Sequence, residues 1–147
     1  MAAGYDEPNR AARAANAVIR WLAEAGISLA GTRAIRVRGR KTGQNRGVVV
    51  NVLTVDGMDY LVSPRGNTQW ARNLRAAGTL EVGPRWRRRQ TRAAEVADGD
   101  KPDLLRRYLD RWYWEVKGHM AGLTPTSGDQ ELRAAAPTIP VFALASP

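Results

Sequence analysis

The strongest constraint on the fold is a β-hairpin signal in the middle of the chain. Residues 46–55 are rich in β-branched valine, and residues 58–62 form a second short apolar segment. Asp56 and Gly57 lie between them, and an Asp-Gly pair between two such runs is typical of a two-residue turn that joins antiparallel strands. The sequence therefore predicts one strand from Arg46 to Val55 and another from Met58 to Val62.

The rest of the chain predicts further strands around this hairpin and helices between them. Apolar periodicity and terminal glycines place strands at 34–38, 79–82, 85–96 and 139–145, and helices at 8–25, 68–77, 101–117 and 129–135. Asp100 is expected to cap the helix that begins at residue 101. Antiparallel strands with one inserted helix and flanking helices predict an α+β fold built on a compact barrel or sheet.

Length and composition narrow the class of protein. A single domain is expected for 147 residues, with residues 1–7 as a flexible tail. The chain has no cysteine and only one histidine, His119, which excludes thiolate or multi-histidine metal sites and cysteine nucleophiles. No apolar run approaches the ~20 residues of a membrane span, and no signal-peptide layout is present. These features predict a cytoplasmic protein.

A glycine-rich basic turn stands out in a chain that is itself basic, with a net charge of +9. Such a charge favours an anionic partner or ligand. The segment 36–47 holds five basic residues, three glycines and no acid. Its candidate anion-binding residues are Arg40, Lys41, Thr42 and Arg46, because a glycine turn lets an anion approach backbone N–H groups and arginine can grip phosphate or carboxylate bidentately. A solvated hairpin is the alternative, and Arg36 and Arg38 are interpreted as a solvated strand face.

A second polar and basic segment runs from Ser63 to Trp70, where a predicted strand ends and a helix begins. A helix N-terminus attracts anions through its free N–H groups and its macrodipole. Trp70 can pack against a flat ring or, as tryptophans more often do, anchor the core. The two segments together strengthen the hypothesis of a bound anionic ligand.

Two motifs together resemble the deazaflavin-dependent nitroreductase and quinone reductase family. They are GRKTGQNR at residues 39–46 and WARNL at residues 70–74, and the strand end at 60–63 lies between them. Its members are small split β-barrel proteins related in fold to flavin-binding pyridoxamine-phosphate oxidases. The resemblance extends over residues 32–96 and to the closing segment 138–142, while the N-terminal helix matches only in kind. It implies a split β-barrel of antiparallel strands with helices packed on it.

The resemblance also implies a site for coenzyme F-420, a 5-deazaflavin with a phosphodiester and an oligoglutamate tail. The residues that would hold the phosphate and the acidic tail are Arg40, Lys41, Thr42 and Arg46. Those that would face the deazaflavin ring are Val48, Val49 and Asn51. Those that would wrap the ring with backbone donors are Ser63, Pro64, Arg65 and Gly66. Trp70 and Asn73 would close the pocket. Relatives often have a longer loop with paired glycines and a lysine where this chain has Pro64 and Arg65.

The resemblance implies a chemistry that needs no metal site and no cysteine nucleophile, which agrees with the absence of cysteine from the sequence and its single histidine. A reduced deazaflavin passes a hydride from its own ring, so no metal and no catalytic side chain are expected, and a product proton can come from solvent or a tyrosine. The expected acceptor is an apolar, electron-poor small molecule such as an enone, a quinone or a nitroaromatic. Tyr113 and Trp114 are candidate substrate contacts, whereas Tyr108 and Trp112 have the spacing of core residues.

Other functions stay open at this point. The same barrel could bind FMN, which has one phosphate and no glutamate tail, or carry a lipid or quinone without chemistry. A nucleic-acid binder would use the segment 85–89, in which Trp86 lies among arginines. Those arginines alternate between two faces of a predicted strand, so no nucleic-acid partner is expected.

The helix predicted at 8–25 bears on localisation and assembly. Contact with a membrane surface through this helix would make the protein peripherally membrane-associated. Packing on the edge of the domain is the favoured interpretation, because the apolar face is mostly alanine and buries little area. No feature of the sequence decides the oligomeric state, and a monomer is the expectation.

Overall fold

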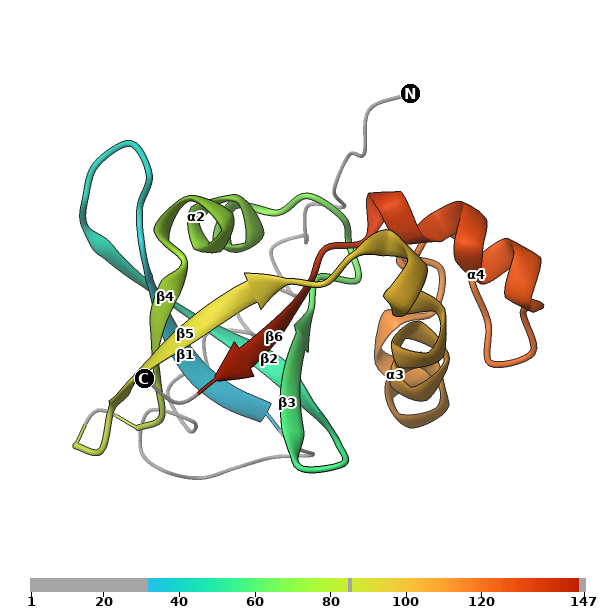
Figure 1. Cartoon of the computed structure of the whole chain (residues 1–147), viewed down its shortest axis with the longest axis horizontal. Coiled ribbons are helices and arrows are strands. Elements are labelled where there is room, and N and C mark those ends of the chain that lie inside the picture. The colour runs from blue at the N-terminus through green and yellow to red at the C-terminus, as the bar shows by residue number, and fades with distance from the viewer. Residues whose placement is uncertain (1–31, 85, 146–147) are drawn as a thin grey trace.

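The computed structural model describes residues 32–84 and 86–145, and these form a closed barrel with helices packed on it (Figure 1). The strands are β1 (Thr32–Arg38), β2 (Asn45–Val55), β3 (Met58–Val62), β4 (Thr79–Val82), β5 (Arg89–Glu95) and β6 (Val141–Ala145). Every neighbouring pair is antiparallel, in the order β1-β2-β3-β6-β5-β4. The predicted α+β fold with a split β-barrel is confirmed.

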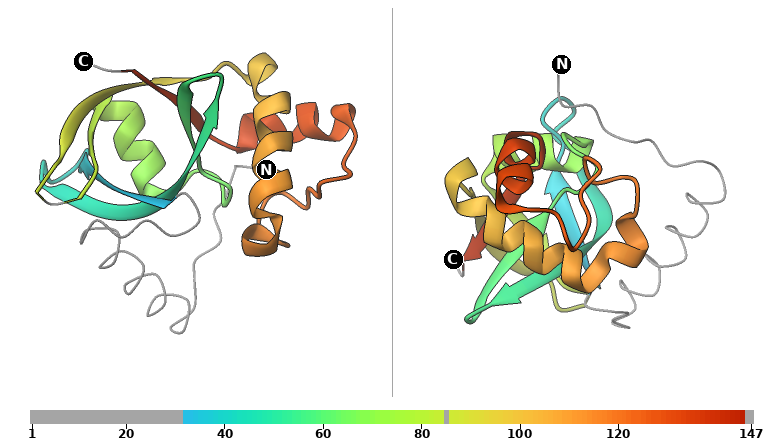
Figure 2. Two further views of the ribbon diagram at one scale, coloured as in Figure 1. Left: turned by 90° about the horizontal axis from the view of Figure 1, so that it is seen from below. Right: turned by 90° about the vertical axis from the view of Figure 1, so that its right-hand side faces the viewer.

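The helices occupy two places around the barrel. They are α2 (Gln69–Ala77), α3 (Lys101–Val116) and α4 (Asp129–Ala135), with short 3-10 turns η1 (Asp98–Asp100) and η2 (Ala136–Thr138). α2 lies against one end of the barrel, and α3 packs with α4 beside it (Figure 2). The predicted tail and the helix at 8–25 lie outside the described residues. Within the described part of the chain, no helix is long and apolar enough to cross a membrane.

The β2–β3 hairpin forms where the sequence predicts it. Asp56 and Gly57 have φ angles of 51° and 79°, and a two-residue turn with positive φ at both positions matches the right-handed twist of the flanking strands. Val55 pairs with Met58 across this turn. The register then places alternate side chains of β2 on opposite faces of the barrel wall.

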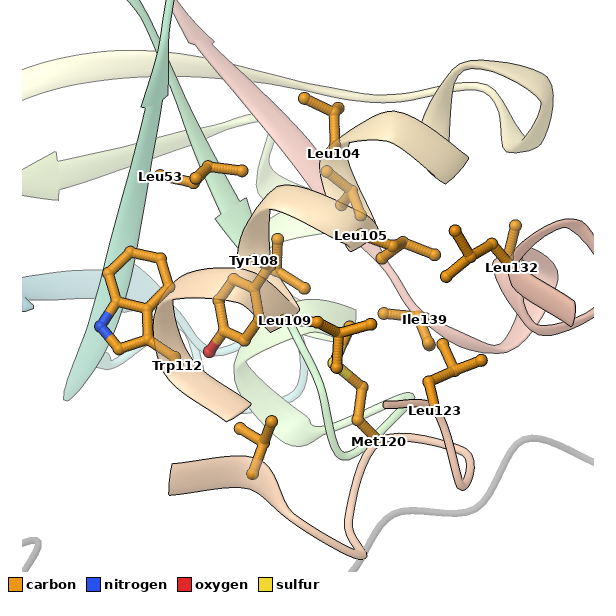
Figure 3. Packing of buried hydrophobic residues seen from close by; sticks show 14 residues of the cluster. Leu53, Leu104, Leu105, Tyr108, Leu109, Trp112, Met120, Leu123, Leu132 and Ile139 are labelled. Atoms are coloured by element: carbon orange, nitrogen blue, oxygen red, sulfur yellow. The ribbon is translucent and has the colours of Figure 1, made fainter. Parts of the chain in front are cut away.

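Two apolar clusters lie on the two sides of that wall. The barrel core fills the interior and comprises Ile35, Val37, Val50, Val52, Leu61, Ala71, Leu74, Leu80, Phe142 and Leu144. The helical core lies outside the barrel, between its wall, α3 and α4 (Figure 3), and comprises Leu53, Val62, Leu104, Leu105, Tyr108, Leu109, Trp112, Val116, Met120, Leu123, Leu132, Ala136, Ile139 and Val141. β2 contributes to both clusters, because its even-numbered valines point inward and Leu53 points outward.

Two local predictions are wrong. β5 begins at Arg89 rather than residue 85, because Gly83 (φ 112°) starts a turn that the Arg87 N–H closes on the Pro84 carbonyl at 2.9 Å. Asp100 does not cap α3 with its side chain. It lies in η1 with φ −96° and ψ −2°, which is not the extended conformation from which a carboxylate reaches the following N–H groups.

Candidate cofactor site

The turn between β1 and β2 is compact, and we call residues 38–46, which include the adjoining strand ends with Arg38 and Arg46, the basic loop. The Gly39 N–H donates to the Gln44 carbonyl at 2.8 Å, and the Gly43 N–H donates to the Gly39 carbonyl at 2.9 Å. The Thr42 hydroxyl accepts from the Gln44 N–H at 3.2 Å. A Cβ at Gly39 would lie 2.9 Å from the Thr42 Oγ1 atom, and Gly43 has a φ of 73°. Both glycines are therefore required for the tight path of the loop.

Asn73 of α2 holds the basic loop in place. Its Oδ1 atom accepts from the Arg40 backbone N–H at 3.1 Å and from the Arg40 guanidinium at 2.7 Å. The guanidinium also donates to the Gln69 Oε1 atom at 3.0 Å. Asn73 is only 5% exposed, so its two bonds to Arg40 are partly shielded from water, whereas the bond to Gln69 is exposed. The two sequence motifs thus meet physically, and Arg40 and Asn73 are engaged in joining them.

Three cations remain around this loop. Lys41 and Arg46 are exposed, and Arg46 Nε lies 3.8 Å from the position that a Cβ at Gly39 would take. The Arg38 guanidinium lies 3.5 Å from the corresponding position at Gly43. None of the three forms an ion pair with another residue in the described part of the chain. The sequence interpretation placed Arg38 on a solvated strand face, and Arg38 is indeed exposed. It did not predict that the guanidinium lies beside Gly43, because that contact depends on how the loop turns back.

The loop from β3 to α2 is closed by its own hydrogen bonds. The buried Ser63 hydroxyl donates to the Gly66 carbonyl at 2.6 Å and lies 2.9 Å from the Thr68 hydroxyl. The Ser63 N–H donates to the Pro140 carbonyl at 2.9 Å, and the Gly66 N–H donates to the Ser63 carbonyl at 3.1 Å. Pro64 has no N–H. The predicted wrapping of a ring by backbone donors is therefore corrected at these three residues, because their donors are absent or already used.

Trp70 belongs to the barrel. Its ring centroid lies 6.2 Å from that of Phe142, at a tilt of 51°, and it packs against the barrel core. The N-terminus of α2 is capped by Thr68, whose hydroxyl accepts from the Ala71 N–H at 3.4 Å. The structure thus favours the core-anchor interpretation of Trp70.

The strand residues predicted to face a ring divide between two faces of β2. Val48 packs against the barrel core. Val49 and Asn51 have the opposite parity and lie on the outer face, which is also the face of Leu53. On this face Val49 is partly exposed, whereas Asn51 is 5% exposed and is bonded to α3. The prediction that Val48 shares that face is corrected, because adjacent strand residues point to opposite sides.

Asn51 takes part in a buried network with α3. Its Nδ2 atom donates to the Tyr108 hydroxyl at 3.1 Å and to the Glu115 Oε2 atom at 3.1 Å. Its Oδ1 atom is buried and has no hydrogen-bond partner among the residues that the structure describes. An orphaned buried acceptor costs about 1–3 kcal/mol, so such atoms usually mark the place of a water or a ligand.

Burial is the main influence on the pKa of Tyr108. Desolvation raises the pKa of Tyr108, the hydrogen bond from Asn51 opposes that shift, and the charge of Glu115 adds to it. The ring packs in the helical core at 4.9 Å from Trp112 (Figure 3). Sequence reasoning placed Tyr108 in the core but missed Glu115. Their seven-residue spacing in the predicted helix is the signal that could have linked them. In the structure α3 is kinked between the two residues, at Trp112 (φ −124°, ψ 18°).

The candidate substrate residues lie in different environments. Tyr113 is half-buried and packs against the helical core. Trp114 is 70% exposed, and its indole N–H donates to the Arg111 carbonyl at 3.2 Å. Of the two, only Trp114 presents a large free surface.

A groove elsewhere on the surface does not fit the predicted cofactor. It lies between the outer face of the barrel and the start of α3, with a floor that includes Tyr60 and Leu104 and a rim of Glu95, Asp100 and Asp103. Those carboxylates would repel a phosphate or an oligoglutamate tail. The basic loop, with its three cations, has the sign of charge that such a ligand needs.

Comparison with known proteins identifies the family. Residues 12–117 match the model of the family described as F420H(2)-dependent quinone reductase. The chain belongs to this family, and the predicted enzyme class, a coenzyme F-420-dependent reductase, is confirmed. A search of curated proteins finds no significant match.

Solved structures support the fold. A protein of unknown function from Agrobacterium tumefaciens superposes with a TM-score of 0.55 at 18% identity, covering 95% of this chain and 55% of that protein. An F420-H2 dependent reductase gives 0.54 at 18% identity, covering 78% and 94%. A putative pyridoxamine 5'-phosphate oxidase from Listeria innocua gives 0.50 at 8% identity, covering 78% and 82%. The chain thus spans about half of the Agrobacterium protein, and at these identities the likeness is one of fold alone.

Proposed function

We propose that the chain binds reduced coenzyme F-420 across the basic loop and the outer face of β2, and reduces an apolar, electron-poor small molecule. The observation that carries this proposal is that Lys41 and Arg46 are exposed and form no ion pair with another described residue, on a loop that Asn73 anchors through Arg40. A family match over both motifs supports the choice of cofactor.

The charged end of the cofactor is assigned to Lys41 and Arg46, with Arg38 as a further contact. An ammonium or guanidinium that already faces water loses little on meeting a phosphate, and the bond is charge-assisted. Arg40 has a structural role in addition to the one predicted. Its Nη1 group donates to Gln69 and Asn73, so it shapes the loop, and its Nε and Nη2 groups can still donate to the anion as predicted.

The ring end is assigned to the outer face of β2. Val49 offers an apolar contact there, and Asn51 offers the unpartnered Oδ1 acceptor. Arg46 and Asn51 are five residues apart on β2, about 17 Å at ~3.4 Å per residue, but strand alternation turns their side chains to opposite faces. A ligand that meets both therefore passes over the edge of β2 that β3 leaves unpaired at residues 45–51. That span suits an elongated ligand with a flat ring at one end and an anion at the other.

When bound, the reduced deazaflavin supplies the hydride from its own ring. The protein's contribution is to fix the anionic end, to orient the ring on β2 and to keep water from the reacting face. A quinone, an enone or a nitroaromatic is the proposed class of acceptor, and the family description favours a quinone. Trp114 is the proposed contact for an apolar acceptor, because it is the exposed aromatic of α3.

The test is a side-by-side titration of coenzyme F-420 and FMN, followed by fluorescence. We expect F-420 to bind more tightly, because its oligoglutamate tail adds carboxylates that FMN lacks. Turnover is then measured with a panel of quinones, enones and nitroaromatics. Tighter binding of FMN would favour the flavin alternative. If neither binds below about 0.1 mM, where binding is worth only ~5.5 kcal/mol, the proposal is wrong.

A further inference from the structure

We infer that Glu115 is a positioning residue that turns the Asn51 amide so that its Oδ1 atom accepts a hydrogen bond from an N–H donor of the bound ring. This inference rests on the proposed function, since the ring is that of the deazaflavin. The network that carries it is the one joining β2 to α3 through Asn51, Tyr108 and Glu115.

The orientation of the amide follows from the chemistry of its partners. A primary amide has a donor end and an acceptor end, and its direction is set by the groups that it meets. An ionised carboxylate can only accept, so the Glu115 Oε2 atom at 3.1 Å requires the Nδ2 end of Asn51. The Tyr108 hydroxyl keeps its proton at pH 7, as a phenol with an ordinary pKa near 10 already does, and its oxygen also accepts from Nδ2. Both donors of the amide are therefore used.

The acceptor end is left without a donor. Asn51 is 5% exposed, and within residues 32–84 and 86–145 its Oδ1 atom has no hydrogen-bond partner. A buried unpartnered carbonyl oxygen signals a missing donor. On the outer face of β2, beside Val49, the proposed function places the ring of the cofactor. Flavins and deazaflavins carry a ring imide N–H between two carbonyls, which is the donor that this oxygen lacks.

Glu115 decides the direction more strongly than Tyr108 does. A tyrosine hydroxyl can donate as well as accept, so by itself it would tolerate either direction of the amide. Glu115 cannot donate. Because its side chain reaches the network from an exposed position on α3, it can be replaced without opening a hole in the helical core.

The decisive variant is Glu115→Lys, which puts a donor-only group where an acceptor-only group stood. The amide then turns its Oδ1 atom to the ammonium and its Nδ2 end to the ligand, where it faces another donor. We expect the Kd of a deazaflavin nucleoside, which lacks phosphate and tail, to rise about tenfold, as for the loss of one hydrogen bond. Because this nucleoside carries neither the phosphate nor the glutamate tail, the added positive charge does not by itself account for weaker binding.

Matched variants isolate the effect. Asp110→Lys makes the same charge reversal at an exposed position of α3 outside the network, and it should leave the Kd unchanged. Glu115→Gln can still accept through its side-chain oxygen, so it should retain most of the affinity. A nucleoside methylated at the imide nitrogen lacks the donor. It should bind wild type about tenfold more weakly than the parent compound and should bind Glu115→Lys with no such difference.

A second readout uses the protein alone. The Asn51 side-chain NH2 signals in a 15N–1H spectrum should be protected from hydrogen exchange in wild type and lose that protection in Glu115→Lys. Unprotected signals in wild type would overturn the inference. Equal binding of the parent and methylated nucleosides would also overturn it while leaving the proposed function intact. If wild type binds no deazaflavin at all, the proposed function fails and takes the inference with it.

Discussion

The basic loop and the Asn51 network both present polar groups to one proposed ligand, yet they are built in opposite ways. In the basic loop the backbone is fixed by Asn73 and the cations Lys41 and Arg46 project into water. In the network Asn51 and Tyr108 are buried, Glu115 reaches Asn51 from an exposed position, and one acceptor is left over. The difference indicates a division of labour, in which exposed charge supplies salt-dependent affinity and buried hydrogen bonds supply orientation.

Among these variants, the largest change in free energy is expected for the stability of Asn73→Ala. Asn73→Ala leaves the Arg40 backbone N–H without its acceptor and frees the basic loop from α2. We expect a loss of about 2–3 kcal/mol in the free energy of unfolding, since a buried hydrogen-bonding group is orphaned. Urea unfolding measures it. A loss below ~0.5 kcal/mol would show that the loop holds its shape without α2.

The next largest effect is expected on cofactor binding, when one of the exposed cations Lys41 and Arg46 is removed. Lys41→Ala and Arg46→Ala should each raise the Kd for coenzyme F-420 about tenfold, because a charge-assisted hydrogen bond to an anion is lost. The rate of hydride transfer at saturating cofactor should stay unchanged. Stopped-flow measurement separates the two quantities. If either variant slows only the saturated step, its assignment to the anionic end is wrong.

Tyr108 gives a pH-dependent prediction for the network. Burial raises the pKa of Tyr108 above the value of 10.0 expected in the unfolded chain. The folded state therefore holds the phenolic proton more tightly, and the stability due to this group is complete below pH 10 and falls as pH rises above it, by up to about 1.4 kcal/mol per pH unit. Tyr108→Phe should remove that slope.

The control for Tyr108→Phe is Tyr60→Phe, at a half-buried tyrosine outside the network. That variant should keep the loss of stability above pH 10, measured by urea unfolding at several pH values. Equal slopes in wild type and Tyr108→Phe would mean that the hydroxyl is not buried as described.

The smallest change in stability is expected for a substitution at Gln69. Its side-chain oxygen accepts from the Arg40 guanidinium at 3.0 Å, but the bond is exposed to water. Gln69→Ala should therefore change the free energy of unfolding by less than about 0.5 kcal/mol, in contrast to Asn73→Ala on the same helix. Thermal unfolding of the two variants in parallel makes the comparison, and equal losses would contradict the assignment of Asn73 as the main anchor.

Local signals predicted the fold well. The Asp56-Gly57 turn fixes the β2–β3 register within a few residues, and Gly78 ends α2 in the left-handed conformation at φ 72°, donating its N–H to the Leu74 carbonyl. The start of β5 was mispredicted because the alternating pattern from residue 85 continues through a turn that Gly83 and Pro84 impose. Alternation alone does not reveal that the Arg87 N–H is bonded to Pro84.

The candidate site was less predictable, because its contacts are long-range. The pairing of the two motifs was visible in the sequence, but its cause, the contact of Arg40 with Asn73 across 33 residues, was not. Strand alternation places Val48 and Val49 on opposite faces of β2, and this could have been predicted from the sequence. The bond between Asn51 and Glu115 spans 64 residues and leaves no local trace.

The measurement that tests the division of labour most directly is the salt dependence of binding in wild type and in a Lys41→Ala/Arg46→Ala double variant. For coenzyme F-420, the wild-type Kd should rise steeply between low and high salt, and the double variant should lose most of that slope. For the deazaflavin nucleoside, both proteins should bind equally and without salt dependence. A double variant that keeps the full salt slope, or that also loses the nucleoside, would contradict the account.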